Sequence, residues 1–195
     1  EETLPFETVY QADANAPLDT RRVSQAGQEG LLQRTIRVRY ENGIEVERTV
    51  EAEDIVTEKR DQVISYGTQI VLRTVDTPNG PAEYWRKLRV YATSYHPAAL
   101  GGDDVTAIGM KLQHGVVGID PNIIDYRTNI FIPGYGVGVA ADTGLPRNNP
   151  YWIDLGYSDA DWVNWHEWID IYLLTPVPDE IDYFLPATAR GGPVP

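Results

Sequence analysis

Apolar and charged residues alternate along residues 35–50, TIRVRYENGIEVERTV, in the pattern of a β-hairpin. A two-residue loop at Asn42-Gly43 would place Val38 opposite Glu47 and mix apolar with charged positions on one face. A three-residue loop, 41–43, keeps each face consistent and places opposite charges across the strands. It gives these pairs: Tyr40 with Ile44, Val38 with Val46, Arg39 with Glu45, and Arg37 with Glu47. We therefore predict a type I turn with Gly43 as a left-handed bulge.

Similar short runs, rich in Val, Ile, Tyr and Thr and broken by 17 Gly and 14 Pro, predict an all-β chain. The runs fall into a β module over residues 1–69 and a denser set over 88–175, with 70–87 as a connector. SDADWVNWHEW, 158–168, predicts one or two helical turns capped by Ser158. Residues 176–195 contain five prolines, which predicts an irregular tail that docks loosely or not at all.

The composition narrows the classes of partner. A chain of 195 residues with 42% hydrophobic residues can bury a real core. The net charge of -13 argues against nucleic acid and anionic membranes as partners. There are no cysteines, which excludes thiol chemistry and cysteine-ligated zinc, and no long apolar run that would predict a membrane-spanning helix. The chain opens on Glu1 without a signal peptide, so we expect a processed or trimmed chain.

The N-terminal module resembles the five-glycine (G5) domain of bacterial wall proteins. The matching stretches are FETVY (6–10), QAGQEG (25–30), the Asn42-Gly43 hairpin and VISYGT (63–68). The matching glycines are Gly27, Gly30, Gly43 and Gly67, while one earlier glycine of the pattern is absent. The resemblance implies an elongated β module that binds wall glycan containing N-acetylglucosamine or acts as a spacer.

The second set of strands resembles the three-aspartate (3D) domain. The motifs occur in the family's order over about ninety residues: AT-S-Y-HP (92–97), TAIG (106–109), GIDP (118–121), IPGYG (132–136), ADTG (141–144) and IDL (153–155). The three aspartates are then Asp120, Asp142 and Asp154. The resemblance implies a six-stranded double-psi β-barrel with short helical turns, similar to that of lytic transglycosylases. Those enzymes cleave the β-1,4 bond between N-acetylmuramic acid and N-acetylglucosamine and release a 1,6-anhydro sugar.

Two stretches depart from the pattern of that family. Between the last two aspartates the second glycine and a Lys-Gly pair are replaced by LPRNNPYW, 145–152, where Arg147 can stand in for the lysine. Arg127 occupies a position where the family tends to have glycine. The altered loop puts the activity in question and favours a non-catalytic wall protein that binds glycan in an expansin-like groove.

The chemistry implied by the resemblance needs a single proton carrier. The C6 hydroxyl of muramic acid is a tethered nucleophile, so one carboxyl group can protonate the leaving oxygen and then take the proton from O6. We assign this role to Asp154, because it lies in the apolar stretch YWIDLGY, where burial would raise its pKa. Asp142 would repel it and stabilise an oxocarbenium-like state. Asp120 would orient the pair.

The predicted glycan contacts surround these acids, and no cofactor is expected. They are Tyr95, Thr106, Tyr135, Thr143, Gly144, Arg147 and Trp152, with Tyr151 and Tyr157 as further stacking candidates. Trp162, Trp165 and Trp168 are expected to pack the end of the barrel. The partner would be peptidoglycan glycan strands, bound outside the cell or at the wall by a monomer.

Simpler interpretations stay open. Each aspartate can be an ordinary turn or strand-edge residue, and the whole chain can be a structural surface module. The three histidines lack metal-binding spacing, so no metal site is predicted. A single D-T-G stretch does not support an aspartic protease within one chain, because that dyad needs two.

Overall fold

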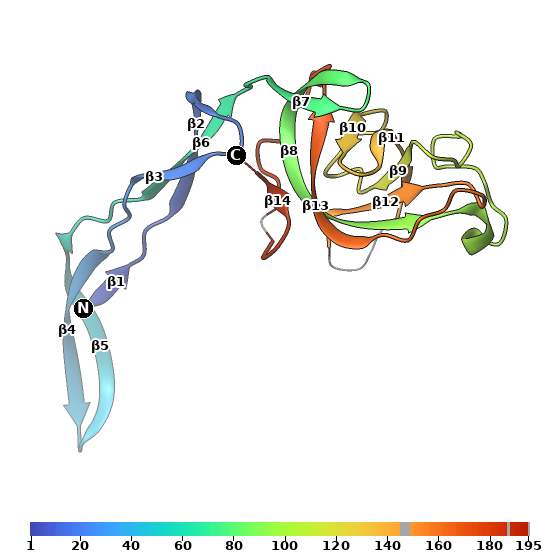
Figure 1. Cartoon of the computed structure of the whole chain (residues 1–195). Coiled ribbons are helices and arrows are strands. Elements are labelled where there is room, and N and C mark those ends of the chain that lie inside the picture. Colours follow the sequence, from blue (N-terminus) through green and yellow to red (C-terminus); the bar gives the residue numbers. More distant parts are fainter. Residues whose placement is uncertain (145–148, 187, 195) are drawn as a thin grey trace. The chain divides into compact units, whose positions relative to one another are not determined.

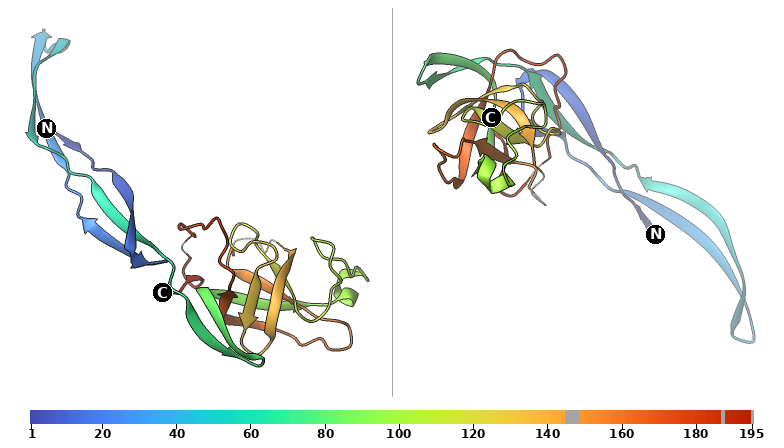
Figure 2. Two further views of the ribbon diagram at one scale, coloured as in Figure 1. Left: turned by 90° about the horizontal axis from the view of Figure 1, so that it is seen from above. Right: turned by 90° about the vertical axis from the view of Figure 1, so that its right-hand side faces the viewer.

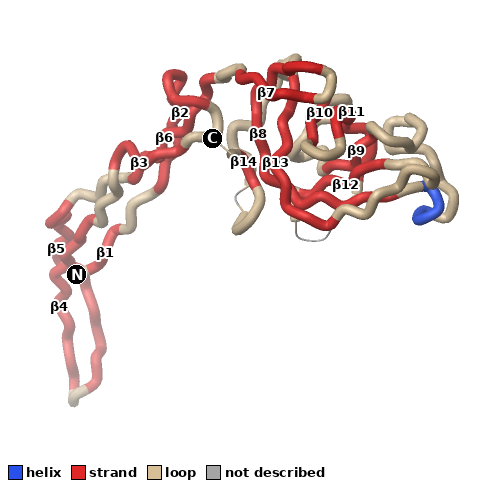
Figure 3. Tube along the Cα trace, viewed as in Figure 1, coloured by secondary structure: helices blue, strands red, loops and turns tan. Residues whose placement is uncertain are grey.

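A computed structural model describes residues 1–144, 149–186 and 188–194 of the chain. The chain divides into two compact units (Figure 1). Unit 1 comprises Glu1–Ala16 and Thr20–Thr68, and unit 2 comprises Pro17–Asp19 and Gln69–Pro195. The expectation of an all-β chain is confirmed, and among the described residues the 3-10 helix η1 (Pro97–Leu100) is the one helical element (Figure 3).

Unit 1 consists of two three-stranded sheets (Figure 1). The first has the order β1-β4-β5, with β1 at Glu2–Leu4, β4 at Gly30–Glu41 and β5 at Ile44–Thr57. The second has the order β2-β6-β3, with β2 at Thr8–Pro17, β6 at Gln62–Gln69 and β3 at Arg21–Gln25. Nearly every residue of β5 is exposed, so this sheet has little core. Cross-strand ion pairs such as Arg34 with Glu53, at 2.6 Å, accompany the backbone ladder instead.

The predicted three-residue hairpin loop is wrong. Glu41 pairs with Ile44, so the loop has two residues, and Asn42 (φ 51°) and Gly43 (φ 81°) both have positive φ, as a type I′ turn requires. A register shift next to Arg39 then places it opposite Glu47, which lies 3.3 Å from it. The prediction assumed that one face had to stay apolar, but both faces of this hairpin are exposed.

Unit 2 contains a closed six-stranded β-barrel with the order β12-β9-β11-β10-β13-β8, in which β8 also pairs with β12 (Figures 1 and 2). This confirms the predicted barrel. The strands are β8 (Gly80–Tyr95), β9 (Val116–Ile119), β10 (Asn129–Ile132), β11 (Gly136–Thr143), β12 (Trp152–Gly156) and β13 (His166–Leu174). β9 and β11 are parallel, as are β8 and β12, while the other neighbours are antiparallel.

The barrel core follows from alternation along the strands. In β8, Leu88, Val90 and Ala92 are almost fully buried, as expected for a strand with one face toward a core. In β12, Ile153 and Leu155 are fully buried on either side of Asp154. Because successive side chains of a strand point to opposite faces, Asp154 faces away from that core.

Three further segments differ from the sequence expectations. Residues 70–87 contain β7 (Arg73–Thr77) and the first part of β8, which pair as a hairpin. The helix predicted at 158–168 is wrong: Asp161 accepts hydrogen bonds from the amide and hydroxyl of Ser158 in a turn, and the chain then enters β13. Trp165 packs against the core, but Trp162 is 43% exposed, so the expectation that all three tryptophans pack the barrel end is wrong for Trp162.

The proline-rich tail is docked on the barrel, contrary to the prediction. β14 (Gly192–Pro193) pairs with β8, and Leu185 is only 3% exposed. Tyr151 donates a hydrogen bond of 2.7 Å from its hydroxyl to the carbonyl of Pro186. Proline prevents regular structure but does not prevent packing, so the number of prolines predicted the irregular backbone and not the docking.

Among the described residues, no helix has the length and apolar character needed to cross a membrane.

Candidate active-site groove

The barrel brings Asp142 and Asp154 to either side of one glycine. Gly118 of β9 pairs with Asp142 of β11 on one side and with Asp154 of β12 on the other. A register shift between Ala140 and Asp142 interrupts the alternation of β11, and both alanines, Ala140 and Ala141, are buried. Such a bulge re-aims the next side chain. Asp142 consequently lies on the same side of the sheet as Asp154.

Gly118 leaves the space between the two acids open. A Cβ atom at this position would lie 3.3 Å from the Cβ of Asp154 and 4.0 Å from the Cβ of Asp142. Both aspartate side chains therefore leave the sheet next to the same point, and any side chain at residue 118 would stand between them.

Asp142 is held by three hydrogen-bond donors. The Tyr95 hydroxyl donates to Oδ2 at 2.7 Å, and the amides of Ala107 and Thr143 donate to Oδ1 at 3.0 and 2.9 Å. An ionised carboxylate only accepts hydrogen bonds and can take all three. Because these donors come from three different segments, the orientation of the Asp142 carboxyl group is fixed from several sides. Burial, together with Asp142, raises the pKa of the Tyr95 hydroxyl, which stays protonated as a donor.

Among the described residues, Asp154 accepts fewer hydrogen bonds than Asp142, and it is partly buried. Its Oδ1 accepts a hydrogen bond of 2.7 Å from the Thr93 hydroxyl, and that hydroxyl accepts one of 2.8 Å from the indole of Trp152. Burial raises the pKa of Asp154 from 3.8 to about 6; the Thr93 bond opposes this, the charge of Asp142 adds to it, and His166 opposes it. A carboxyl group in this state can hold a proton in mildly acidic solution and exchange it with a ligand.

The two acids line a groove of about 300 Å³. The other described residues that line it are Tyr95, Leu100, Asp103, Val105, Gly118, Thr143, Gly144 and Trp152. Four of the predicted glycan contacts, Tyr95, Thr143, Gly144 and Trp152, are therefore at the groove. Gly144 packs on the Trp152 indole, since a Cβ there would lie 2.6 Å from the ring.

Other predicted site residues lie elsewhere. Oδ1 of Asp120 accepts hydrogen bonds from the amide and the side chain of Asn122, both at 2.9 Å, and Asp120 is not among the described residues lining the groove. Thr106 is buried, and its hydroxyl accepts a hydrogen bond from the amide of Met110 within a loop. The Tyr135 hydroxyl hydrogen-bonds with backbone groups of Gly115, Val116 and Gly156. Tyr135 belongs to the core. Arg147 lies outside the described residues.

Thr93, Gly118 and His166 were missed as site residues, although the first two lie inside the quoted motifs. The signal available was their position: Thr93 is two residues from Tyr95 on the same face of a strand, and Gly118 begins GIDP. His166 gave no signal, because it reaches the site only through the pairing of β13 with β8 opposite Thr93.

Within the described part of the chain, no three His, Cys, Asp or Glu side chains are grouped closely enough to hold a metal ion.

Comparison with known proteins identifies the N-terminal unit and relates much of the chain to two wall proteins. Residues 1–69 match the family described as the G5 domain. The chain is 30% identical over 159 residues to the putative cell wall shaping protein YabE of Bacillus subtilis, covering 74% of this chain and 39% of YabE. It is 34% identical over 76 residues to the cell wall-binding protein YocH of the same organism, covering 37% of this chain and 26% of YocH.

The chain thus spans 39% and 26% of the length of these two relatives. As the sequence resemblance indicated, the first 69 residues of this chain are a G5 domain.

Proposed function

We propose that the barrel is a lytic transglycosylase that cleaves the glycan strands of peptidoglycan between N-acetylmuramic acid and N-acetylglucosamine. The observation that carries the proposal is the state of Asp154. It is a partly buried carboxyl group with a pKa raised to about 6, and it faces a groove next to a second, fixed carboxyl group. A general acid needs a pKa close to the working pH, and pairs of acids with different environments commonly divide the roles of acid and stabiliser.

In the proposed reaction Asp154 gives its proton to the glycosidic oxygen as the bond from that oxygen to C1 breaks. Positive charge develops at C1 and the ring oxygen, where Asp142 stabilises it electrostatically. The C6 hydroxyl of the muramic acid then forms the bond to C1 and loses its proton to Asp154. The sugar closes to the 1,6-anhydro form, no water is consumed, and Asp154 returns to its starting state.

The remaining groove residues have supporting parts in this proposal. Thr93 orients the Asp154 carboxyl group, and Tyr95 does the same for Asp142. The Trp152 indole bonds to Thr93 and lines the groove, where its ring can pack on a sugar face. Gly118 leaves room for the scissile oxygen between the acids. Asp120 supports the loop after β9 and is not required to touch the sugar.

Partner and location follow from the same proposal. Peptidoglycan lies outside the cytoplasmic membrane, so the protein would act after export, at the wall. The G5 domain would hold the barrel at the glycan or act as a spacer. The relatives with wall-shaping and wall-binding names support this setting.

The second candidate is a non-catalytic protein that binds wall glycan in the same groove. YocH is named for wall binding, and the stretch 145–152 departs from the pattern of the three-aspartate family. In this case Asp142 and Asp154 would accept hydrogen bonds from sugar hydroxyl groups without transferring a proton.

The test is digestion of purified peptidoglycan with the wild-type chain, Asp154→Asn and Asp120→Asn, followed by mass spectrometry of the soluble fragments. Asp179→Asn, a change at an exposed residue of the tail, is the matched control. The closure by the C6 hydroxyl should give muropeptides about 18 mass units, one water, below the hydrated form.

Transglycosylase activity predicts these fragments with the wild type and the Asp179→Asn control, and no fragments with Asp154→Asn. With Asp120→Asn the amount of fragments should fall less than with Asp154→Asn. Fragments of the hydrated mass would contradict the reaction type. Co-sedimentation with the wall and no fragments from any variant would favour the binding protein. Asp154 can act as an acid only while its carboxyl group is protonated, so activity should also decline as the pH rises above about 6.

A further inference from the structure

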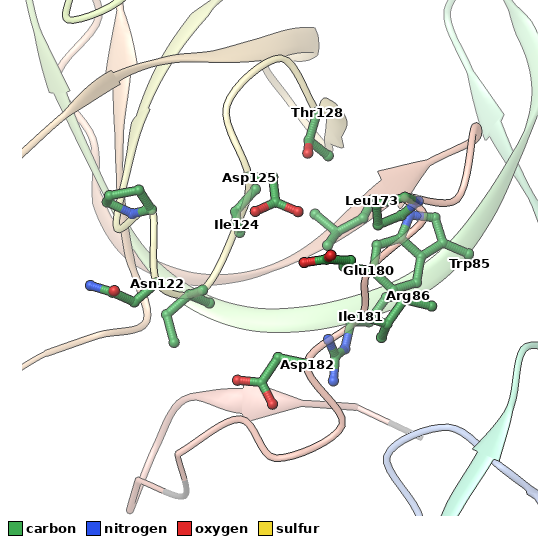
Figure 4. Close-up of a pocket in the computed structure, with 13 residues that line it drawn as sticks. Trp85, Arg86, Asn122, Ile124, Asp125, Thr128, Leu173, Glu180, Ile181 and Asp182 are labelled. Carbon is green, nitrogen blue, oxygen red and sulfur yellow. The ribbon is translucent and has the colours of Figure 1, made fainter.

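A second cavity, of about 450 Å³, lies on unit 2 away from the groove and shares none of the groove's lining residues (Figure 4). Its walls come from β8, the loop after β9, β13 and the docked tail. The described residues that line it are Trp85, Arg86, Pro121, Asn122, Ile123, Ile124, Asp125, Thr128, Leu173, Pro178, Glu180, Ile181 and Asp182. Its volume is in the range of small-molecule sites, about 300–1,000 Å³.

Trp85 gives this cavity an unused hydrogen-bond donor. The residue is 7% exposed, and its indole Nε1 is a buried polar atom with no hydrogen-bond partner among the described residues. Buried indole N–H groups normally have a partner, so one without is exceptional. In the view of Figure 4 the carboxyl groups of Asp125 and Glu180 lie between the Trp85 indole and Asn122. An oxygen atom of a ligand would satisfy this N–H.

The cavity also carries uncompensated negative charge. Within the described part of the chain, no ion pair involves Asp125, Glu180 or Asp182, although Asp182 accepts the amide of Phe184 at 2.6 Å. The neighbouring Arg86 does not neutralise them, because its guanidinium is occupied by both carboxyl oxygens of Asp19, at 2.5 and 2.9 Å. A ligand for this place should therefore be cationic.

The spacing of these groups argues for an organic cation. Among the described residues the acids do not come together as a metal-binding group. The space between them and Trp85 is bordered by aliphatic side chains, including Ile124, Leu173 and Ile181. A carbon chain that ends in an ammonium group fits such a wall better than a fully hydroxylated ring does.

We propose that this cavity is a binding site for an aliphatic primary ammonium ligand, such as a lysine-type side chain of a peptide. Its ammonium group pairs with Asp125 and Glu180, its carbon chain lies on the aliphatic wall, and a backbone carbonyl oxygen accepts the hydrogen bond of Trp85 Nε1. The site is separate from the proposed glycan cleavage and does not depend on it.

The test uses the whole chain labelled with nitrogen-15 and follows the indole N–H resonance of Trp85 by NMR, assigned with Trp85→Phe. The probe is Nα-acetyl-L-lysine methylamide. Nα-acetyl-L-norleucine methylamide, which lacks the ammonium group, is the neutral control. The lysine probe should shift the Trp85 resonance and bind more tightly than the norleucine probe. Replacement of one carboxylate should weaken binding of the lysine probe by about two- to fivefold, as for an exposed ion pair.

The variants make the interpretation specific. Asp125→Asn combined with Glu180→Gln should remove the preference for lysine over norleucine, whereas Asp179→Asn, exposed and outside the cavity lining, should keep it. Raised salt should weaken binding of the lysine probe in the wild type. D-glucosamine is a further probe, because its ammonium group is attached to a hydroxylated ring and not to a carbon chain.

Three results would overturn the proposal. The first is equal response to the lysine and norleucine probes, or response to neither. The second is a preference for lysine that persists in the double variant. The third is tighter binding of D-glucosamine than of the lysine probe, which would exclude the aliphatic assignment. Asp125 and Glu180 are exposed, so their replacement should leave the barrel folded, and Trp85→Phe serves only to assign the resonance.

Discussion

Replacing Asp154 with asparagine should change how the stability of unit 2 depends on pH. The pKa of Asp154 is raised from 3.8 to about 6, chiefly by burial. Below pH 3.8 the group is protonated in the folded and the unfolded chain, and above about pH 6 it is ionised in both. Between these values the folded barrel holds a proton that the unfolded chain has lost. The free energy of unfolding contributed by this group therefore falls as the pH rises through this window.

The magnitude follows from the size of the pKa change. One pKa unit corresponds to about 1.36 kcal/mol, so a rise from 3.8 to about 6 amounts to ~3 kcal/mol. Asparagine resembles the protonated acid in shape and never ionises. The stability of Asp154→Asn minus that of the wild type should therefore increase by ~3 kcal/mol between about pH 3 and pH 7. Any constant effect of the substitution cancels from this difference.

Urea titration followed by tryptophan fluorescence measures unit 2 selectively, because all five tryptophans lie in it: Trp85, Trp152, Trp162, Trp165 and Trp168. Asp170→Asn is a control with the opposite sign. Burial alone would raise the pKa of Asp170, but Lys87 and Arg89 bond to it and leave its pKa lowered, so its contribution to stability grows as the pH rises. A pH-independent difference for Asp154→Asn, or a decrease toward pH 7, would refute the assignment of Asp154 as a buried proton carrier.

Three other substitutions test separate parts of the structure. Gly118→Ala places a Cβ 3.3 Å from that of Asp154, so release of fragments from peptidoglycan should fall about 10- to 100-fold with the barrel still folded; unchanged release would mean that the substrate does not enter between the acids. Arg127 has φ 72°, so Arg127→Gly should raise the free energy of unfolding in urea by about 0.5–1 kcal/mol. A lower free energy of unfolding would show instead that the arginine side chain stabilises the fold. Asp19→Asn leaves the buried Arg86 guanidinium without its charged partner and should cost about 3–5 kcal/mol in the same titration, whereas a cost below 1 kcal/mol would place that pair in contact with water.

Local pattern predicted the strands well but not what covers them. In β8 the buried residues Leu88, Val90 and Ala92 alternate with less buried ones, because burial on one side imposes a period of two. The same rule failed at Asn42-Gly43, where both faces are exposed and turn preference sets the register. Residues 158–168 failed for another reason: the Ser158 side chain closes a turn with Asp161, and the chain continues as a strand that pairs with β8.

The candidate site was only partly predictable for a similar reason. Asp142 and Asp154 are twelve positions apart in the sequence, and that spacing alone does not bring them together. They meet because β9, which comes earlier in the chain, lies between their strands and presents Gly118 at the crossing. The family resemblance supplied the pair without this geometry. It also noted Arg127 at a glycine position, and the positive φ there gives the physical reason for the glycine preference.

The unequal surroundings of the two acids argue for the assignment of their roles. Asp142 accepts three hydrogen bonds, two of them from backbone amides that cannot turn away, so the orientation of its carboxyl group is fixed. Among the described residues, Asp154 accepts one hydrogen bond, from a hydroxyl group that can rotate, and burial favours its protonated form. A proton carrier has to change charge in each reaction cycle, and a group held by a single rotatable donor can do so without leaving several buried donors unpaired. The hydrogen bonding therefore supports Asp154 as the acid and Asp142 as the stabilising charge, independently of their positions in the family pattern.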